Sequence, residues 1–132
     1  MSACERHRIA LTTDTTSGVT AYTTGAGITG RIESLIYYQH ATAFTTTCDM
    51  TISIVNTSQV VYATTGLDAS ETISPRLPTH NSTGGVLASS TAGAAGSLSG
   101  VPTHFYLSSD HIKVVIASGG ATKQGTVDVL IT

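Results

Sequence analysis

Apolar and polar residues alternate along much of this 132-residue chain with a period of two. The segment HRIALTT places Ile9 and Leu11 on one face and Arg8 on the other, and VTAYTT alternates in the same way. This period is typical of half-buried β-strands. The letters DTTSG between the two segments are typical of a turn. We therefore predict a β-hairpin over residues 7–24.

The middle of the chain continues the pattern less evenly. RIESLIYYQ (residues 31–39) fits a strand buried on part of both faces; a short helix fits the same letters, but paired tyrosines and β-branched residues favour the strand. MTISIVNT and VVYATT alternate on either side of a turn. Since Pro75 and Pro78 do not suit a central strand, residues 66–84 are predicted as an extended connection with one short edge strand. Residues 91–102 are predicted as a loop of small residues.

Short strands separated by turn signals predict the fold class. No segment long enough for a typical helix joins a capping residue to a 3.6-residue apolar period. We expect an all-β fold, a single antiparallel β-sandwich or barrel-like domain of about seven or eight short strands over residues 7–132. Residues 1–6 are expected to form a flexible N-terminal arm.

Composition and charge limit the kinds of partner that the protein is expected to bind. Charged residues make up 11% of the chain, against about 25% in typical proteins, and the formal net charge is −2. The basic residues are scattered, so we expect no nucleic-acid partner. MSACERHR lacks the apolar core of a signal peptide, and no apolar run approaches the ~20 residues of a membrane span. We therefore expect a protein made in the cytoplasm and without a membrane partner. The Thr-rich surface suits packing beside copies of itself or on a larger scaffold; a monomer with an uncharged polar surface fits as well.

The closing segment contains SGGATKQG (residues 118–125), which could be a phosphate-binding loop or a turn. A P-loop needs Lys followed by Ser or Thr at the start of a helix. Here Lys123 is followed by Gln and Gly, and TVDVLIT then alternates like a strand. Without a helix N-terminus to hold a phosphate, we predict a hairpin turn in which the glycines at 119, 120 and 125 supply positive φ.

No spacing of reactive residues indicates an enzyme, a metal or a cofactor. The histidines are His7, His40, His80, His104 and His111. They form no HExxH or Cys/His pattern, although ligands from distant strands could still meet in space. If several met at a subunit contact, their titration between about pH 5 and 8 would weaken assembly in acid. No pair of carboxylates stands out as a glycosidase pair, and Cys4 and Cys48 are interpreted as free thiols in a reducing cytoplasm. We expect neither catalysis nor a cofactor.

Five segments together resemble a family of small all-β proteins from tailed bacteriophages, found among head and neck structural proteins. These segments are HRIALTTDTTSGVTAYT, GRIESLIYY, ATAFTTTCDMTISI, SPRLPTHNSTGGVL and DHIKVVIASGGATKQGTVDVLIT. The family's motifs are turn and strand patterns: an early T-D-x-x-G turn, a P-R-x-x-x-H segment and a closing R-I-K-V-V-x-x-G-G strand and hairpin. His111 departs from the family, in which arginine is frequent at that position.

The resemblance implies a virion structural protein, and we favour a capsid decoration (cement) protein on the capsid surface. Its expected partners are the major capsid protein and copies of itself, with a trimer favoured. A head–tail connector, a tail component and a virion-surface module that binds carbohydrate or a receptor remain alternatives. An inter-subunit ion pair near Asp110 and Lys113 is one open interpretation, and a turn carboxylate beside a solvent-facing lysine is the other. The candidate interface residues are Arg6, His7, Arg8, Pro75, Arg76, Leu77, Pro78, His80, His111 and Lys113.

Overall fold

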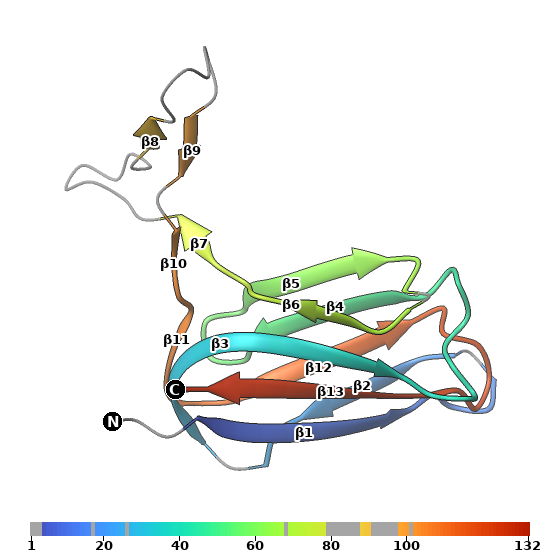
Figure 1. Ribbon diagram of the computed structural model, residues 1–132. Coiled ribbons are helices and arrows are strands. Elements are labelled where there is room, and N and C mark those ends of the chain that lie inside the picture. The colour runs from blue at the N-terminus through green and yellow to red at the C-terminus, as the bar shows by residue number, and fades with distance from the viewer. Residues whose placement is uncertain are drawn as a thin grey trace.

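Two antiparallel β-sheets face each other in the computed structural model (Figure 1). The structure describes residues 4–16, 18–25, 27–67, 69–78, 88–90, 98–100 and 102–132. Strands but no helices occur in these ranges. The prediction of an all-β, sandwich-like fold is therefore confirmed.

The first sheet is built around the longest strand. Its members are β1 (Glu5–Thr12), β3 (Ile28–Gln39), β6 (Glu71–Ile73), β11 (Tyr106–Asp110) and β13 (Gln124–Ile131). Their order is β1-β13-β3-β11, and β6 pairs with the later part of β3. Alternate residues of β13, such as Val127 and Val129, are buried against the second sheet. The predicted strand over residues 31–39 is confirmed, and it begins earlier, at Ile28.

The second sheet has the order β2-β12-β4-β5. Its strands are β2 (Thr20–Thr23), β4 (Asp49–Ile54), β5 (Gln59–Thr65) and β12 (Ile112–Ala117). The two central strands show clean alternation: Ile52 of β4 lies across from Val114 of β12, and neither is exposed. The predicted pairing of MTISIVNT with VVYATT is confirmed by the β4–β5 hairpin. With β-branched side chains at most inward positions, the apolar faces of the two sheets form one continuous core.

Two predicted hairpins are wrong, although their strands exist. β1 pairs with β13 and β2 pairs with β12, so the segment 13–19 crosses from one sheet to the other. The closing segment 118–123 makes a second crossing, because β12 and β13 also lie in different sheets. Alternation shows only which face of a strand is buried. It does not show whether the next strand along the chain pairs with it in the same sheet or packs on its buried face from the opposite sheet.

The N-terminal boundary also differs from the prediction of an arm over residues 1–6. Glu5 and Arg6 already belong to β1, where they lie across from Ile131 and Leu130. Residues 1–3 lie outside the described residues. Two charged residues at the start of a strand did not mark its beginning because their side chains need not be buried there.

In the described part of the chain, nine strands form the two sheets, against the seven or eight expected, and four more lie outside them. β7 (Leu77–Pro78) pairs with β10 (Pro102–Thr103), and β8 (Ala88–Ser90) pairs with β9 (Leu98–Gly100). Figure 1 shows these four strands leading away from one end of the sandwich. We call strands β7 to β10 the projecting hairpin. β6 and β7 confirm an extended connection after residue 66, whereas the predicted loop 91–102 contains β9 and the start of β10.

Candidate functional site

The glycine-rich segment 118–123 is tied to neighbouring loops. The Gly119 amide donates to the Gly18 carbonyl at 2.8 Å, and the Lys123 amide donates to Oγ1 of Thr13 at 2.7 Å. The Thr122 amide donates to the carbonyl of Asp14 at 2.9 Å. These donors are engaged within the protein, and the segment leads into β13 rather than a helix. The prediction of a turn in place of a phosphate-binding loop is thus confirmed, but the turn joins two sheets.

A β-bulge places Glu33 at the end of the sandwich from which the projecting hairpin leaves. Ser34 lies across from Leu130, whereas Ile32 lies across from Ile131, so Glu33 is the extra residue on β3. A bulge turns a side chain away from the direction that regular alternation would give it. The other edge of β3 changes partner here as well, from β11 to β6. Glu33 therefore lies where neither neighbouring strand pairs with β3.

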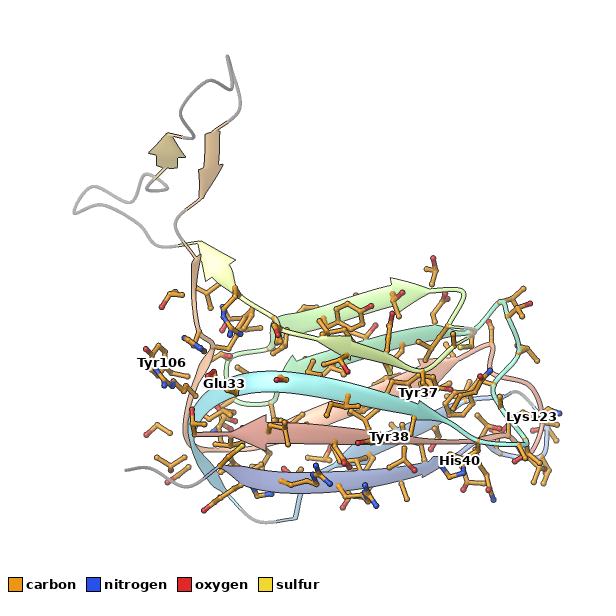
Figure 2. The ribbon with its side chains drawn as sticks, viewed as in Figure 1. Glu33, Tyr37, Tyr38, His40, Tyr106 and Lys123 are labelled. Carbon is orange, nitrogen blue, oxygen red and sulfur yellow. The ribbon has the colours of Figure 1, made fainter. Side chains whose placement is uncertain are left out.

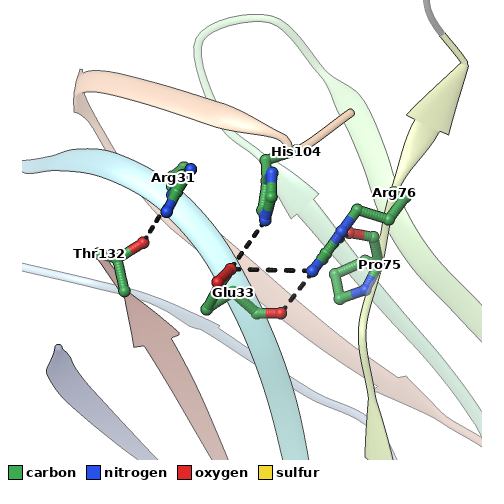
Figure 3. A network of polar contacts seen from close by, with 6 residues as sticks. All are labelled: Arg31, Glu33, Pro75, Arg76, His104 and Thr132. Carbon is green, nitrogen blue, oxygen red and sulfur yellow. Dashed lines mark hydrogen bonds and ion pairs between the residues drawn. The ribbon is translucent and has the colours of Figure 1, made fainter. Parts of the chain in front are cut away.

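Residues from both sides of the projecting hairpin bind Glu33 (Figure 3). Nε2 of His104, which follows β10, lies 2.8 Å from Oε2 of Glu33. Nη2 of Arg76, which precedes β7, lies 3.7 Å from the same oxygen. Nη1 of Arg76 donates to the backbone carbonyls of Glu33 at 3.2 Å and Pro75 at 2.7 Å. One carboxylate thus fixes the two chain segments that enter and leave the hairpin.

Tyr106 and Arg31 lie beside this group. They are directly across from each other on β11 and β3, so their side chains share a face of the sheet. The Arg31 Nε donates to Oγ1 of Thr132 at 2.9 Å. Tyr106 is 66% exposed, the highest value among the exposed large hydrophobic residues of the described chain, and Figure 2 places it at the same end as Glu33. We call the set Arg31, Glu33, Arg76, His104 and Tyr106 the base patch.

Replacing Glu33 with glutamine is expected to loosen the hairpin base while the sandwich stays folded. The substitution keeps the shape of the side chain but removes the charge that faces Arg76 and His104. We expect the amide of Ile32, which donates to the Phe105 carbonyl next to His104, to lose about 0.5–1.5 kcal/mol of protection against hydrogen exchange. Mass spectrometry after exchange measures this effect. Exposed Glu5 offers a matched control, since Glu5→Gln should leave exchange at Ile32 unchanged.

A second charged group lies on the outer face of the first sheet. Asp128 on β13 is fully buried, and its carboxylate accepts hydrogen bonds from Nε and Nη2 of Arg8 at 2.9 and 3.0 Å. Nε of Arg6 lies 3.4 Å from the same carboxylate, and the Arg8 guanidinium stacks 5.6 Å from the centre of the Tyr38 ring. The hydrogen bonds and charge of Arg8 lower the pKa of Asp128, although burial opposes them. Asp128 lies within β13, directly across from Arg8.

The lowered pKa of Asp128 predicts a pH dependence of stability. A carboxyl group whose pKa is lower in the folded protein stabilises the fold above its unfolded pKa, near about 4, and this contribution is lost as the pH falls through the folded pKa. Urea denaturation should therefore find Asp128→Asn less stable than wild type at pH 7. The difference should shrink in strong acid. A gap that stays constant down to pH 2 would contradict this role of Asp128.

Among the described residues, two buried titratable groups, Cys48 and Tyr37, have raised pKa values. Cys48 is buried and burial raises the pKa of its thiol, which disfavours the reactive thiolate. Cys4 is exposed and also free. Burial raises the pKa of Tyr37 to about 12, and its hydroxyl has no hydrogen-bond partner in the described residues. Tyr37 stacks on Phe44 with ring centroids 6.2 Å apart, so it acts as a core residue.

The predicted interface residues fall into separate regions. Arg6, His7 and Arg8 lie on β1, and two of them bind Asp128. Pro75 is buried, and Arg76 and Leu77 are half-buried at the hairpin base. The side chain of Pro78 and the whole of His80 lie outside the described residues. His111 directly precedes β12 and Lys113 lies near its start, in the second sheet.

The two interpretations of Asp110 can be compared directly. Asp110 is buried, and its Oδ1 accepts hydrogen bonds from the backbone amides of His111 at 2.7 Å and Asn56 at 3.0 Å. Nδ1 of His111 lies 2.9 Å from the Thr24 carbonyl, and Lys113 is exposed. These contacts support a turn carboxylate rather than an inter-subunit ion pair.

The sequence prediction missed most of the base patch, since only Arg76 was among the candidate interface residues. Glu33, His104, Arg31 and Tyr106 are far apart in the sequence and share no motif. The one available signal was the broken alternation in RIESLIYY, which accompanies the bulge at Glu33.

Comparisons with known protein families, with curated proteins and with solved structures find no match. No group of three or more potential metal ligands occurs in the described part of the chain. Over the same residues, no helix is long and apolar enough to cross a membrane.

Proposed function

We propose that the protein is a structural component of a tailed-phage virion and, within that class, a capsid decoration protein on the outer shell. The observation that carries the proposal is the projecting hairpin, whose two ends are held to the sandwich by contacts among Glu33, Arg76 and His104. The sequence resemblance to small all-β head proteins supports the same class. A hairpin held at its base can reach a neighbouring subunit while the sandwich stays in place.

Attachment would come from several modest contacts made at once. The proposed partners are the major capsid protein and copies of this chain, with a trimer favoured. Apolar surface buried at each contact contributes about 25 cal/mol per Å², and simultaneous contacts raise the effective concentration of the remaining ones. The low charge of the chain suits this role, because neighbouring copies would not repel each other strongly.

Co-sedimentation with empty capsids of the phage that encodes the protein tests the proposal. A decoration protein binds saturably at hundreds of copies per particle. A ring of few copies at the neck would instead favour a connector, and glycan binding without any capsid binding would favour a receptor-binding module. Arg76→Ala is the informative variant, because it releases one end of the hairpin from Glu33 and should weaken capsid binding. Lys123→Ala, at the end of the sandwich away from Glu33 (Figure 2), serves as its matched control.

A further inference from the structure

The second sheet carries an open hollow of about 560 Å³ over β4 and β5. Its lining residues are Asp49, Thr51, Ala63, Thr64 and Thr65. Asp49 lies across from Thr65 and Thr51 across from Ala63, so these four side chains share the outer face of the sheet. Asp49 is exposed and forms no ion pair with any described residue. The hollow therefore presents one unneutralised carboxylate among hydroxyl and methyl groups.

The base patch carries a positive charge and an exposed aromatic ring, which complement the acidic hollow. Tyr106 is 66% exposed on a face that it shares with Arg31. The Arg31 side chain is anchored through Nε to a neutral hydroxyl, that of Thr132, so its charge is not neutralised by this contact. Tyrosine and arginine are, with tryptophan, enriched at the energetic centres of protein interfaces. An exposed tyrosine beside a positioned arginine fits a polar hollow that contains one carboxylate.

The two surfaces lie at opposite ends of the molecule. β4 starts and β5 ends at the end of the sandwich away from the projecting hairpin, whereas Tyr106 lies next to the hairpin base (Figures 1 and 2). One copy can therefore offer its base patch to one neighbour and its hollow to another without competition between them.

We propose that a second copy of this chain occupies the hollow, with Tyr106 inserted among its threonines and Arg31 paired to Asp49. The contact joins two different surfaces, so it repeats head to tail. Such contacts close into a ring when the rotation between copies permits, and otherwise extend into a filament. The inference deepens the homo-oligomeric part of the proposed function and rests on it only for the biological setting. The association itself requires no capsid.

Sedimentation velocity of the purified full-length protein, without capsids, tests the proposal. Wild type should sediment as an oligomer that dissociates as salt increases. Tyr106→Ala and Asp49→Lys should each raise the dissociation constant at least about tenfold. Both residues are exposed, so circular dichroism should show an unchanged fold. Val60→Ala, at another exposed apolar side chain on β5, is the control and should assemble normally.

Mixing the two defective variants distinguishes a head-to-tail contact from a symmetric one. Tyr106→Ala retains its hollow and Asp49→Lys retains its base patch, so an equimolar mixture should form a one-to-one complex that grows no further. A monomeric wild type, full assembly by either variant, or a mixture without the one-to-one complex would each overturn the proposal.

The experiment distinguishes failure of the head-to-tail contact from failure of the proposed capsid decoration. A monomer that still saturates capsids overturns the head-to-tail contact alone. An oligomer that assembles as expected but ignores capsids supports the contact and counts against decoration.

Discussion

Replacing Ile52 with alanine is expected to lower the free energy of unfolding by about 2–5 kcal/mol. Ile52 is fully buried in β4, between Val114 of β12 and Tyr62 of β5. Truncation removes apolar atoms from the centre of the core, and the surrounding strands cannot move inward without breaking their pairing. The cost therefore includes both the lost burial and the cavity that remains.

Urea denaturation followed by far-ultraviolet circular dichroism measures this change, since the chain has no tryptophan. The matched control is Val60→Ala on the neighbouring strand, where the valine is 52% exposed and the expected loss is under about 0.5 kcal/mol. Equal losses at the two positions would show that the faces of the second sheet are assigned wrongly.

Replacing Gly125 with valine is expected to destabilise the fold by about 1–3 kcal/mol or more. Gly125 begins the buried face of β13, and an added Cβ would lie 2.5 Å from Cε2 of Phe44 and 2.9 Å from Cε1 of Tyr37. Those rings stack on each other in the core, so neither can move away without losing contacts. The same denaturation measurement detects the loss.

A double-mutant cycle separates crowding by Phe44 from a general preference for glycine. Phe44→Leu should be destabilising by itself, but it should recover part of the stability lost in Gly125→Val because the clash disappears. Strict additivity of the two changes would contradict this explanation of Gly125.

Gly119, Gly120 and Gly125 show what the local sequence can and cannot reveal. All three were expected to supply positive φ, yet only Gly120 does, at 83°. Gly119 and Gly125 instead leave space for other residues: a Cβ at Gly119 would meet the side chains of Ile116 and Thr13. A glycine needed for a turn and a glycine needed for close packing look the same in a sequence, because the second depends on residues that fold against it from elsewhere.

Strand existence was predictable because alternation is a local property. Ile52 and Ile54, for example, could be assigned to one buried face from the sequence, and the structure confirms it. Strand pairing was not predictable in the same way. The connections at 13–19 and 118–123 carry turn residues, but both cross between sheets. A turn-like composition identifies a change of direction without identifying which strand lies next to which.

The base patch lay further beyond the reach of the sequence. The position of Glu33 depends on a bulge in β3. Arg76 and His104 meet at Glu33 only because the projecting hairpin returns to its starting point. Asp128 illustrates the same limit, since an aspartate in an alternating segment gave no indication of the arginines across the ladder on β1.

An image reconstruction of the assembled virion tests most directly whether this chain coats the phage head. We predict a β-sandwich at many symmetry-related positions on the outer shell, with the projecting hairpin in contact with a capsid subunit. Density for the chain only at the neck or tail, or none in purified particles, would contradict a decoration protein.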